Sequence, residues 1–170
     1  MLFKASLDSL AKGVSIAILI LFLGIGASIV YNLDSTNPTE IALWAAFLIE
    51  SIFLGIYLFW YLYAPQAYLV ESDRIKIIRP IGKVDIRFNN ISSIRLVDKS
   101  EIRTLIRTFG VGGLFGYYGY YYSSSLGKLI LYTTQRKNLL VIEQKVGRKI
   151  LLSPDDTSLV ETLITKFKNW

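Results

Sequence analysis

The chain has 170 residues and a formal net charge of +6 at pH 7, and it contains neither cysteine nor histidine. Without these two residue types, disulfides, thiolate nucleophiles, thiolate or imidazole metal sites and Ser-His-Asp triads are excluded. Any chemistry would have to use carboxylate, lysine, tyrosine or hydroxyl groups. Two long apolar runs and a basic C-terminal part divide the sequence.

The apolar runs are residues 13–33 and 41–63, and only a short polar link separates them. A transmembrane helix needs roughly 20 mostly apolar residues to cross the hydrocarbon core of a bilayer, so both runs are long enough. Because lipid offers the backbone no hydrogen-bond partners, each run is predicted to be a helix, and the short link makes them an antiparallel hairpin. We therefore expect residues 1–63 to form a membrane anchor.

The positive charges predict the orientation of this hairpin. Lys4 and Lys12 precede the first run, further Lys and Arg residues follow the second, and the link has none. The positive-inside rule then places both termini in the cytoplasm, which predicts a multi-pass protein of the bacterial cytoplasmic (inner) membrane. A cleavable signal peptide is the competing interpretation of the first run. That run is too long for a signal sequence, no A-x-A-like site follows it, and a second apolar run comes at once.

Residues 64–170 are predicted to form one small cytoplasmic domain. Alternation of apolar and polar residues predicts seven strands, at residues 66–70, 74–79, 84–88, 91–97, 128–134, 139–144 and 148–152. Ser153, followed by Pro154 and two carboxylates, has the pattern of a helix start, and residues 159–167 have the spacing of an amphipathic helix. The expected fold class is a two-helix transmembrane hairpin followed by an α+β domain, with an antiparallel curved sheet or barrel and a C-terminal helix.

Several segments resemble the bacterial pleckstrin-homology (PH)-like domain families, in which a membrane hairpin often precedes a seven-stranded barrel closed by a C-terminal helix. These segments are Arg107 to Gly119, Gly127-Lys128, Tyr132-Thr133-Thr134, Lys137-Asn138-Leu139 and Ser153-Pro154-Asp155. The resemblance extends over the whole chain. It implies a PH-like domain that acts as a binding or scaffolding module, with no enzyme activity and no cofactor. A fold alone does not fix the ligand.

The predicted domain carries seventeen Lys and Arg against nine Asp and Glu, a net charge of +8. Such a surface would be attracted to an anionic leaflet, although the bias could also reflect only topology and solubility. Arg74, Lys76 and Arg79 could clamp a lipid phosphate. However, the alternation of a strand puts Arg79 on the opposite face from the other two. The basic loop with which eukaryotic PH domains hold phosphoinositides is also absent, since Glu71-Ser72-Asp73 stands in its place.

Residues 110–122 are unusually rich in glycine and tyrosine. We interpret them as a connection that packs on the barrel or lies in the membrane interface. Its candidate contact residues are Phe115, Tyr117, Tyr118, Tyr120 and Tyr121. The glycines do not fit a nucleotide-binding loop, and nucleic acid is not expected as a partner because no Lys or Arg interleaves with the tyrosines.

The preceding residues 102–109 have apolar side chains at helical spacing, with Arg103 and Arg107 on the other side. This pattern predicts a short basic amphipathic helix. Such a helix could cap the barrel or lie in the headgroup plane.

Glu50 is the only charged residue inside the apolar runs, and an ionisable group there is a functional-site candidate. In an antiparallel hairpin it comes level with Gly24, next to the small residues Ala27 and Ser28. We expect it to contact a protein partner or a second copy of the chain. Two hypotheses follow: a membrane-anchored module that binds protein or lipid at the cytoplasmic face, or an accessory subunit of a membrane transporter or enzyme complex.

Overall fold

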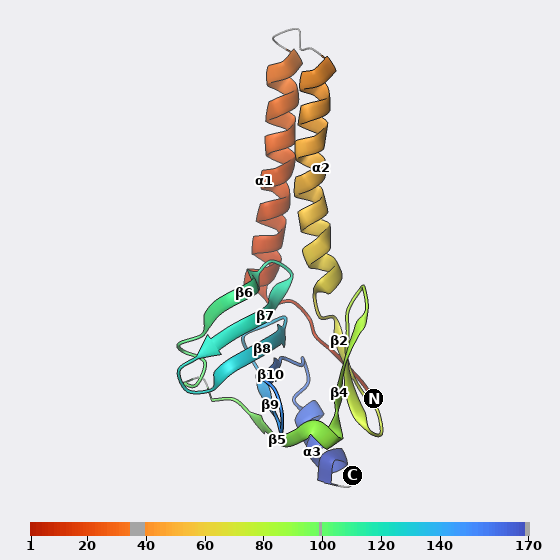
Figure 1. Ribbon diagram of the computed structural model, residues 1–170, viewed down its shortest axis with the longest axis vertical. Coiled ribbons are helices and arrows are strands. Elements are labelled where there is room, and N and C mark those ends of the chain that lie inside the picture. Colours follow the sequence, from red (N-terminus) through yellow and green to blue (C-terminus); the bar gives the residue numbers. More distant parts are fainter. Residues whose placement is uncertain (35–39, 99, 169–170) are drawn as a thin grey trace.

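The computed structural model describes the chain outside residues 35–39, 99 and 169–170. A pair of long antiparallel helices, α1 (Ser9–Asp34) and α2 (Glu40–Tyr63), projects from a β-rich domain (Figure 1). The predicted link between them lies almost wholly outside the described residues. Both helices are long and apolar enough to cross a membrane, judged by length and composition.

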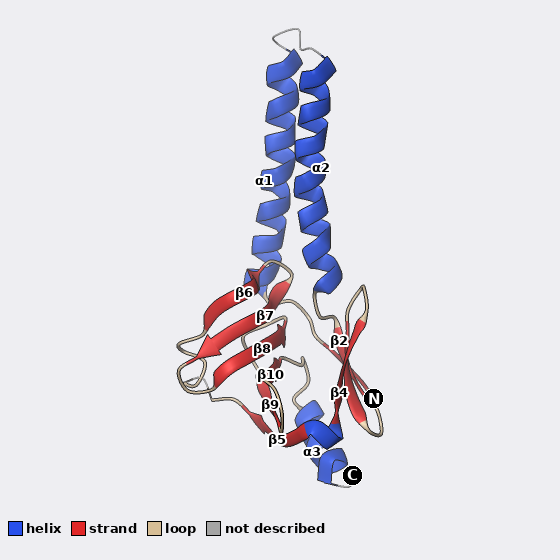
Figure 2. Cartoon of the chain, viewed as in Figure 1, coloured by secondary structure: helices blue, strands red, loops and turns tan. Residues whose placement is uncertain are grey.

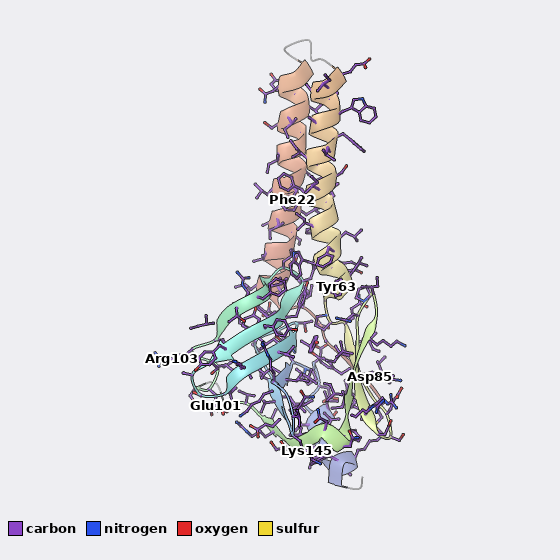
Figure 3. The ribbon with its side chains drawn as sticks, in the orientation of Figure 1. Phe22, Tyr63, Asp85, Glu101, Arg103 and Lys145 are labelled. Atoms are coloured by element: carbon purple, nitrogen blue, oxygen red, sulfur yellow. The ribbon has the colours of Figure 1, made fainter. Side chains whose placement is uncertain are left out.

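The two helices pack on each other, and among the described residues none of α2 and only a few of α1, such as Ala11 and Ser15, are buried. Phe22 of α1 stacks on Phe53 of α2 with ring centroids 4.9 Å apart, about half-way along the pair (Figure 3). Most other side chains of the pair point outward and are apolar. The helix pair therefore presents a hydrophobic surface all round.

The strands form two sheets, not the single seven-stranded sheet predicted from the sequence (Figure 2). The first sheet has the order β1-β2-β3-β4 and is antiparallel. Its strands are β1 (Leu2–Lys4), β2 (Ala67–Val70), β3 (Arg74–Ile78) and β4 (Lys83–Arg87). A 3-10 turn, Phe88–Asn90, leads from it to the second sheet.

The second sheet has the order β5-β9-β10-β8-β7-β6. Its strands are β5 (Ile91–Leu96), β6 (Ile106–Gly113), β7 (Gly116–Ser123), β8 (Gly127–Thr133), β9 (Leu140–Gln144) and β10 (Lys149–Leu152). Only β10 and β8 pair in parallel among the described strands; the other neighbours are antiparallel.

The predicted helix over 102–109 and the predicted connection over 110–122 are both wrong. Residues 106–123 instead form the hairpin β6–β7, with Leu114 and Phe115 between the strands. Tyrosine favours strands, and the alternation of this segment sends Tyr117 and Tyr121 to one face and Tyr118 to the other. The helical spacing extended over only two turns, which is too short to outweigh the sheet.

The first residues of the chain, which the sequence analysis assigned to the membrane anchor, belong to the first sheet. Residues 2–4 pair with β2, and the Met1 amino group donates a hydrogen bond to the Val70 carbonyl over 2.9 Å. The Ala5 N–H donates to the Gln66 carbonyl over 3.0 Å. The chain therefore contributes a strand to the domain before it enters α1.

The space between the sheets holds the larger core, which the C-terminal helix α3 (Ser158–Lys168) completes. Its fully buried side chains include Tyr68, Ile75, Ile77, Phe88, Ile142, Leu152, Leu159 and Leu163. The Tyr68 hydroxyl donates to the Tyr132 carbonyl over 2.6 Å, and burial raises its pKa to about 12. The hydroxyl is thus a neutral hydrogen-bonding group at physiological pH.

The predicted helix start at Ser153 is wrong, because α3 begins at Ser158. The Ser153 hydroxyl accepts a hydrogen bond from the Thr134 N–H over 2.8 Å instead, which ties β10 to the end of β8. The Asp156 carboxylate accepts one from the Ser158 N–H over 2.8 Å. Asp156, not Ser153, therefore caps the first turn.

A second core covers the outer face of the six-stranded sheet. Tyr117, Tyr121, Leu126, Leu129, Leu131, Leu139, Val141 and Leu151 form it together with Ala11 of α1. Leu7, Val97, Ile102 and Leu105 pack against it. The sheet is therefore apolar on both faces, as expected for a sheet covered on each side.

Gly119 makes the hairpin β6–β7 possible. It pairs with Gly110, both have φ near +120°, and a Cβ on Gly119 would lie 2.5 Å from the Phe109 carbonyl oxygen. We predict that Gly119→Ala lowers the free energy of unfolding by at least about 2 kcal/mol, because strain and a backbone clash add. Thermal unfolding of the full chain in detergent measures this.

Gly112→Ala is the matched control. Gly112 lies on β6, and a Cβ there would be 3.1 Å from Nη1 of Arg107, the flexible end of a side chain. We expect a change below about 1 kcal/mol. Equal effects of the two substitutions would contradict the assigned pairing of β6 with β7.

Candidate functional site

The basic strand β3 does not present free cations. Arg74 pairs with Asp73 over 2.8 Å and with Asp85 over 3.3 Å, and Lys76 pairs with Glu71 over 2.6 Å. The hydrogen bond from Arg74 holds the pKa of Asp73 below its usual range. Within the described structure, carboxylates of the same sheet thus already partner two of the three cations that the sequence analysis grouped into a phosphate clamp.

Arg79, the third cation, directly follows β3 in sequence, and its side chain lies apart from the other two, against the last residue of α2. Its guanidinium carbon is 5.3 Å from the ring centroid of Tyr63, and its Nε is buried without a hydrogen-bond partner among the described residues. An aromatic cavity of about 360 Å³ lies here. Its walls are Phe59, Trp60, Tyr63, Phe109, Tyr118, Tyr120, Ile130 and Tyr132. Arg148 makes a cation–π contact with Tyr120, since its guanidinium carbon is 4.4 Å from the centroid of that ring.

The turn of the hairpin β6–β7 is fastened to both helices. The Phe115 N–H donates to the Ser15 hydroxyl over 2.9 Å, and its ring centroid lies 4.8 Å from that of Tyr57 and 5.2 Å from that of Tyr61. The Tyr57 hydroxyl donates to the Ser15 carbonyl over 3.1 Å. We call Ser15, Tyr57, Tyr61 and Phe115 the junction.

Tyr118 adds a further link beside the junction. Its hydroxyl donates to the Trp60 carbonyl, and the two rings lie 6.2 Å apart. Burial raises the pKa of this hydroxyl, so it stays protonated and can donate. Side chains thus fix the domain to the helix pair at several points beyond the chain connection.

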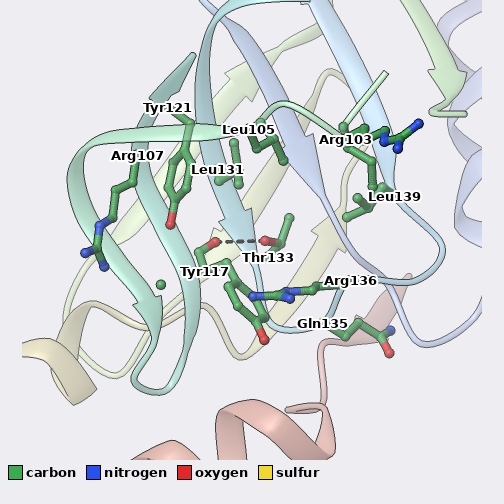
Figure 4. A pocket seen from close by; sticks show the side chains of 12 residues that line it. Arg103, Leu105, Arg107, Tyr117, Tyr121, Leu131, Thr133, Gln135, Arg136 and Leu139 are labelled. Carbon is green, nitrogen blue, oxygen red and sulfur yellow. Dashed lines mark hydrogen bonds between the residues drawn. The ribbon is translucent and has the colours of Figure 1, made fainter. Parts of the chain in front are cut away.

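A pocket of about 460 Å³ opens on the outer face of the six-stranded sheet (Figure 4). We call it the outer pocket. It is lined by Ile102, Arg103, Leu105, Arg107, Gly112, Tyr117, Tyr121, Leu131, Thr133, Gln135, Arg136 and Leu139. Four of these, Arg103, Arg107, Tyr117 and Tyr121, are contact residues predicted from the sequence, and the structure brings them together.

The hydroxyl groups of the outer pocket are engaged within the protein. Tyr121 donates to the Val111 carbonyl over 2.5 Å, and Thr133 donates to the Tyr117 carbonyl over 2.8 Å. The Tyr117 hydroxyl points to Asp8, 3.3 Å from the nearer carboxylate oxygen. Burial raises the pKa of Tyr121 although Arg107 and Arg136 oppose this, so the hydroxyl remains neutral.

The cations of the outer pocket have no acidic partner. Arg136 lies over the ring of Tyr117, 4.7 Å from guanidinium carbon to centroid, and the Arg107 guanidinium lies over Gly112. Arg103 lies between β5 and β6 in sequence, and its side chain is exposed. Across the described ranges, no Asp or Glu comes within ion-pairing distance of these three arginines.

Residues 100–105, which connect β5 to β6, line one side of the outer pocket. An ion pair holds this lining segment in place. Arg95 of β5, an edge strand of the six-stranded sheet, forms two hydrogen bonds with Glu101, of 2.6 and 2.8 Å. The Ser123 hydroxyl donates to the Glu101 carbonyl over 2.7 Å. These contacts place Ile102 and Arg103 over the sheet.

Glu50 points into the helix pair. A Cβ on Gly26 would lie 2.8 Å from the Glu50 carboxyl carbon, so the carboxyl occupies the space that this glycine leaves. Its Oε2 is buried without a hydrogen-bond partner in the described part of the chain. The helix register thus brings Glu50 against Gly26, two residues beyond the expected Gly24.

Sequence reasoning missed several residues of the site. Arg136 falls in the predicted turn between the strands 128–134 and 139–144, and Gln135 was given no role. Ser15 and Asp8 were not considered because they lie far away in sequence. The signal available was the basic turn at 136–137 after a strand, but it does not reveal the β7 tyrosine on which Arg136 stacks. No group of three Asp or Glu in the described residues could hold a metal ion.

The Arg95–Glu101 pair makes the stability of the lining segment depend on pH. The hydrogen bonds from Arg95 lower the pKa of Glu101 from 4.5 to about 2. The pair therefore stabilises the fold fully above pH 4.5, and this stabilisation is lost as the pH falls towards 2. We predict that the wild type melts at a higher temperature than Glu101→Gln above pH 4.5. The difference should vanish near pH 2.

Glu161→Gln is the control for this experiment, because Glu161 is exposed and forms no ion pair among the residues described. The melting temperature of Glu161→Gln should differ from that of the wild type by the same small amount at every pH in this range. A Glu101→Gln difference that persists unchanged down to pH 2 would refute the role of the pair.

Phe115 tests the junction. Each aromatic pair contributes about 0.5–1.5 kcal/mol, so Phe115→Ala is expected to weaken the contact between hairpin and helices by about 1–3 kcal/mol. Hydrogen exchange should then quicken at residues 9–18 and 110–118. Ile106→Ala is the control, since that side chain lies on the same hairpin, in β6, and is 62% exposed. Unchanged exchange in Phe115→Ala would show that the junction does not hold the two parts together.

Comparison with known proteins assigns the domain. The family described as "Bacterial PH domain" matches residues 66–166, which is more than half of the chain. Searches of curated proteins and of solved structures found no significant match. The matched residues run from just before β2 to the last turn of α3, and they include the β6–β7 hairpin and the outer pocket. The chain therefore belongs to the bacterial PH domain family.

Proposed function

We propose that the protein is a non-enzymatic binding module that a transmembrane hairpin anchors in the cytoplasmic membrane and holds at the cytoplasmic face. PH domains are generally binding modules without catalytic activity, which supports the first part of this proposal. The junction is the observation that carries the rest, because it sets the domain in one position relative to the helices. A flexible tether would need no such contacts.

The apolar surface of the helices supports a membrane anchor. Core helices of water-soluble proteins are buried. In the described structure α2 has no buried residue, and α1 has hardly any along its apolar stretch. Two exposed helices with apolar side chains all round would aggregate in water. In lipid the same surface is satisfied.

A cleaved signal sequence fits the structure poorly. Residues 2–4 supply an edge strand, and Ser15 in the second turn of α1 holds Phe115. Removing α1 with the residues before it would strip both from the domain. Retention of the first helix is therefore part of this proposal.

The distribution of charge supports a cytoplasmic domain. Lys4 ends β1, which precedes α1, Lys12 lies in the first turn of α1, and the domain that follows α2 is basic. This arrangement satisfies the positive-inside rule only if the domain and both termini are cytoplasmic. The proposed partners are a protein, a second copy of the chain or an anionic lipid surface.

The alternative, an accessory subunit of a transporter or membrane enzyme, relied on Glu50 as a contact for another helix. Its carboxyl packs on Gly26 inside the hairpin, which leaves it less available to a neighbour. We therefore favour the binding module.

Single cysteines test this topology, because the natural chain has none. Ser72→Cys places a thiol on an exposed turn of the domain, and Thr36→Cys places one in the stretch of sequence that links α1 to α2. In intact spheroplasts a membrane-impermeant maleimide should label only Thr36→Cys, and lysis should expose Ser72→Cys. Labelling of Ser72→Cys before lysis, or release of the protein from membranes by alkaline carbonate, would contradict the proposal.

A further inference from the structure

We propose that the outer pocket binds an organic oxyanion, a phosphate or carboxylate group carried on an apolar or aromatic body. This inference rests on the proposed role as a binding module and names the class of its ligand. Three features carry it: the charge of the pocket, the state of its other polar groups, and its floor.

The charge is the first feature. Elsewhere in the domain two arginines pair with acids, Arg74 with Asp73 and Arg95 with Glu101. Arg79 and Arg148 lie instead over single tyrosine rings. Arg103, Arg107 and Arg136 surround the outer pocket without an acidic partner in the described structure. A guanidinium is weakly hydrated and its fork matches the geometry of carboxylate and phosphate oxygens. The pocket therefore selects negative charge.

The second feature is that the arginines are the donors left for a ligand. Tyr117, Tyr121 and Thr133 all donate within the protein, and the Gln135 amide donates to the Pro154 carbonyl over 3.1 Å. Two acids contact described residues of the pocket: Asp8 faces the Tyr117 hydroxyl, and Asp155 accepts a hydrogen bond from the Gln135 amide over 3.4 Å. Three cations against these two carboxylates leave the site positive.

The third feature is the apolar floor. Ile102, Leu105, Leu131 and Leu139 lie between the arginines, and the pocket volume of about 460 Å³ falls within the roughly 300–1000 Å³ typical of small-molecule sites. Arg107 and Arg103 lie on opposite sides, with Arg136 over Tyr117 between them (Figure 4). An inorganic ion would leave most of this floor uncovered, so we infer an anion with a carbon body.

Such a ligand could be a soluble compound or the headgroup of a lipid. Tyr117, on the floor, contacts Asp8, which directly precedes α1. One side of the pocket therefore lies close to the start of a helix that we place in the membrane. The two sources share the same chemistry, and the experiment below distinguishes them.

The test uses the full chain in phosphatidylcholine nanodiscs and 1-naphthyl phosphate as the probe, titrated by calorimetry. We expect saturable binding at one site by the wild type. Because a hydrogen bond to a charged group contributes about 1.5–3 kcal/mol, Arg136→Gln should weaken binding by about tenfold or more. Lys137→Gln, the exposed neighbour outside the pocket, should bind like the wild type.

Arg107→Gln provides a second variant from a different strand, and an unchanged melting temperature shows that each variant is folded. It should also bind more weakly. Absence of probe binding by the wild type, or equal binding by Arg136→Gln, Arg107→Gln and Lys137→Gln, would overturn the proposal. The topology experiment above does not depend on this pocket, so failure of one is distinguishable from failure of the other.

A second arm assigns the source of the ligand. If a lipid headgroup fills the pocket, phosphatidylglycerol in the nanodisc should block the probe, and native mass spectrometry should show this lipid retained by the wild type but not by Arg136→Gln. If the ligand is soluble, the probe should bind in both kinds of nanodisc. Both results support the oxyanion site and differ only in its source.

Discussion

The hydrogen bond from the Phe115 N–H to the Ser15 hydroxyl joins the two halves of this protein. Ser15 lies in the second turn of α1, and its hydroxyl also donates to the Ala11 carbonyl over 2.7 Å. One buried side chain therefore accepts from the β6–β7 turn and donates within the helix. A buried polar group is stabilising only when it is satisfied, so the turn and the helix must meet in one geometry.

That geometry depends on the backbone of the hairpin. Phe115 has φ of 55°, a left-handed conformation that is uncommon for a large residue, and the flanking Gly113 and Gly116 also have positive φ. The tight turn directs the Phe115 ring at Tyr57 and Tyr61 of α2 while its N–H faces α1. Strain in the turn is thus balanced by contacts with both helices.

The same hairpin shapes the outer pocket. Strand alternation turns Tyr118 towards the helices and Tyr117 and Tyr121 to the opposite face, where they line the pocket. The site that we assign to a ligand and the contacts that hold the domain to its anchor are therefore on two faces of one strand. A ligand in the pocket would sit at a defined place relative to the helices.

Much of the fold could be predicted from sequence, because local patterns govern it. The two apolar helices follow from the length of their apolar runs. The strands between residues 66 and 97, those between 128 and 152, and the C-terminal helix follow from periodicity. Strand β1 could not be predicted, since three residues carry no period and their partner lies more than sixty residues away. The hairpin β6–β7 was missed because its glycines favour a loop in a local reading.

The site was less predictable than the fold for the same reason. Arg103 and Arg107 were identified as basic residues near a Tyr-rich segment, yet their role was assigned to a helix that does not exist. Arg136 joins them only because β8 pairs with β7, a relation between distant parts of the chain. The strand cations Arg74 and Lys76 were recognisable as charges, but their carboxylate partners become evident only in the folded sheet.

The most direct test of the central idea, a binding domain held rigidly on a helix hairpin, is a distance measurement across the junction. Spin labels at Ala27→Cys in α1 and Ser72→Cys in the domain, in the full chain in nanodiscs, report the separation by double electron–electron resonance. A single narrow distance distribution is the predicted result. A broad or multimodal distribution would show that the domain moves freely on its anchor and would contradict the idea.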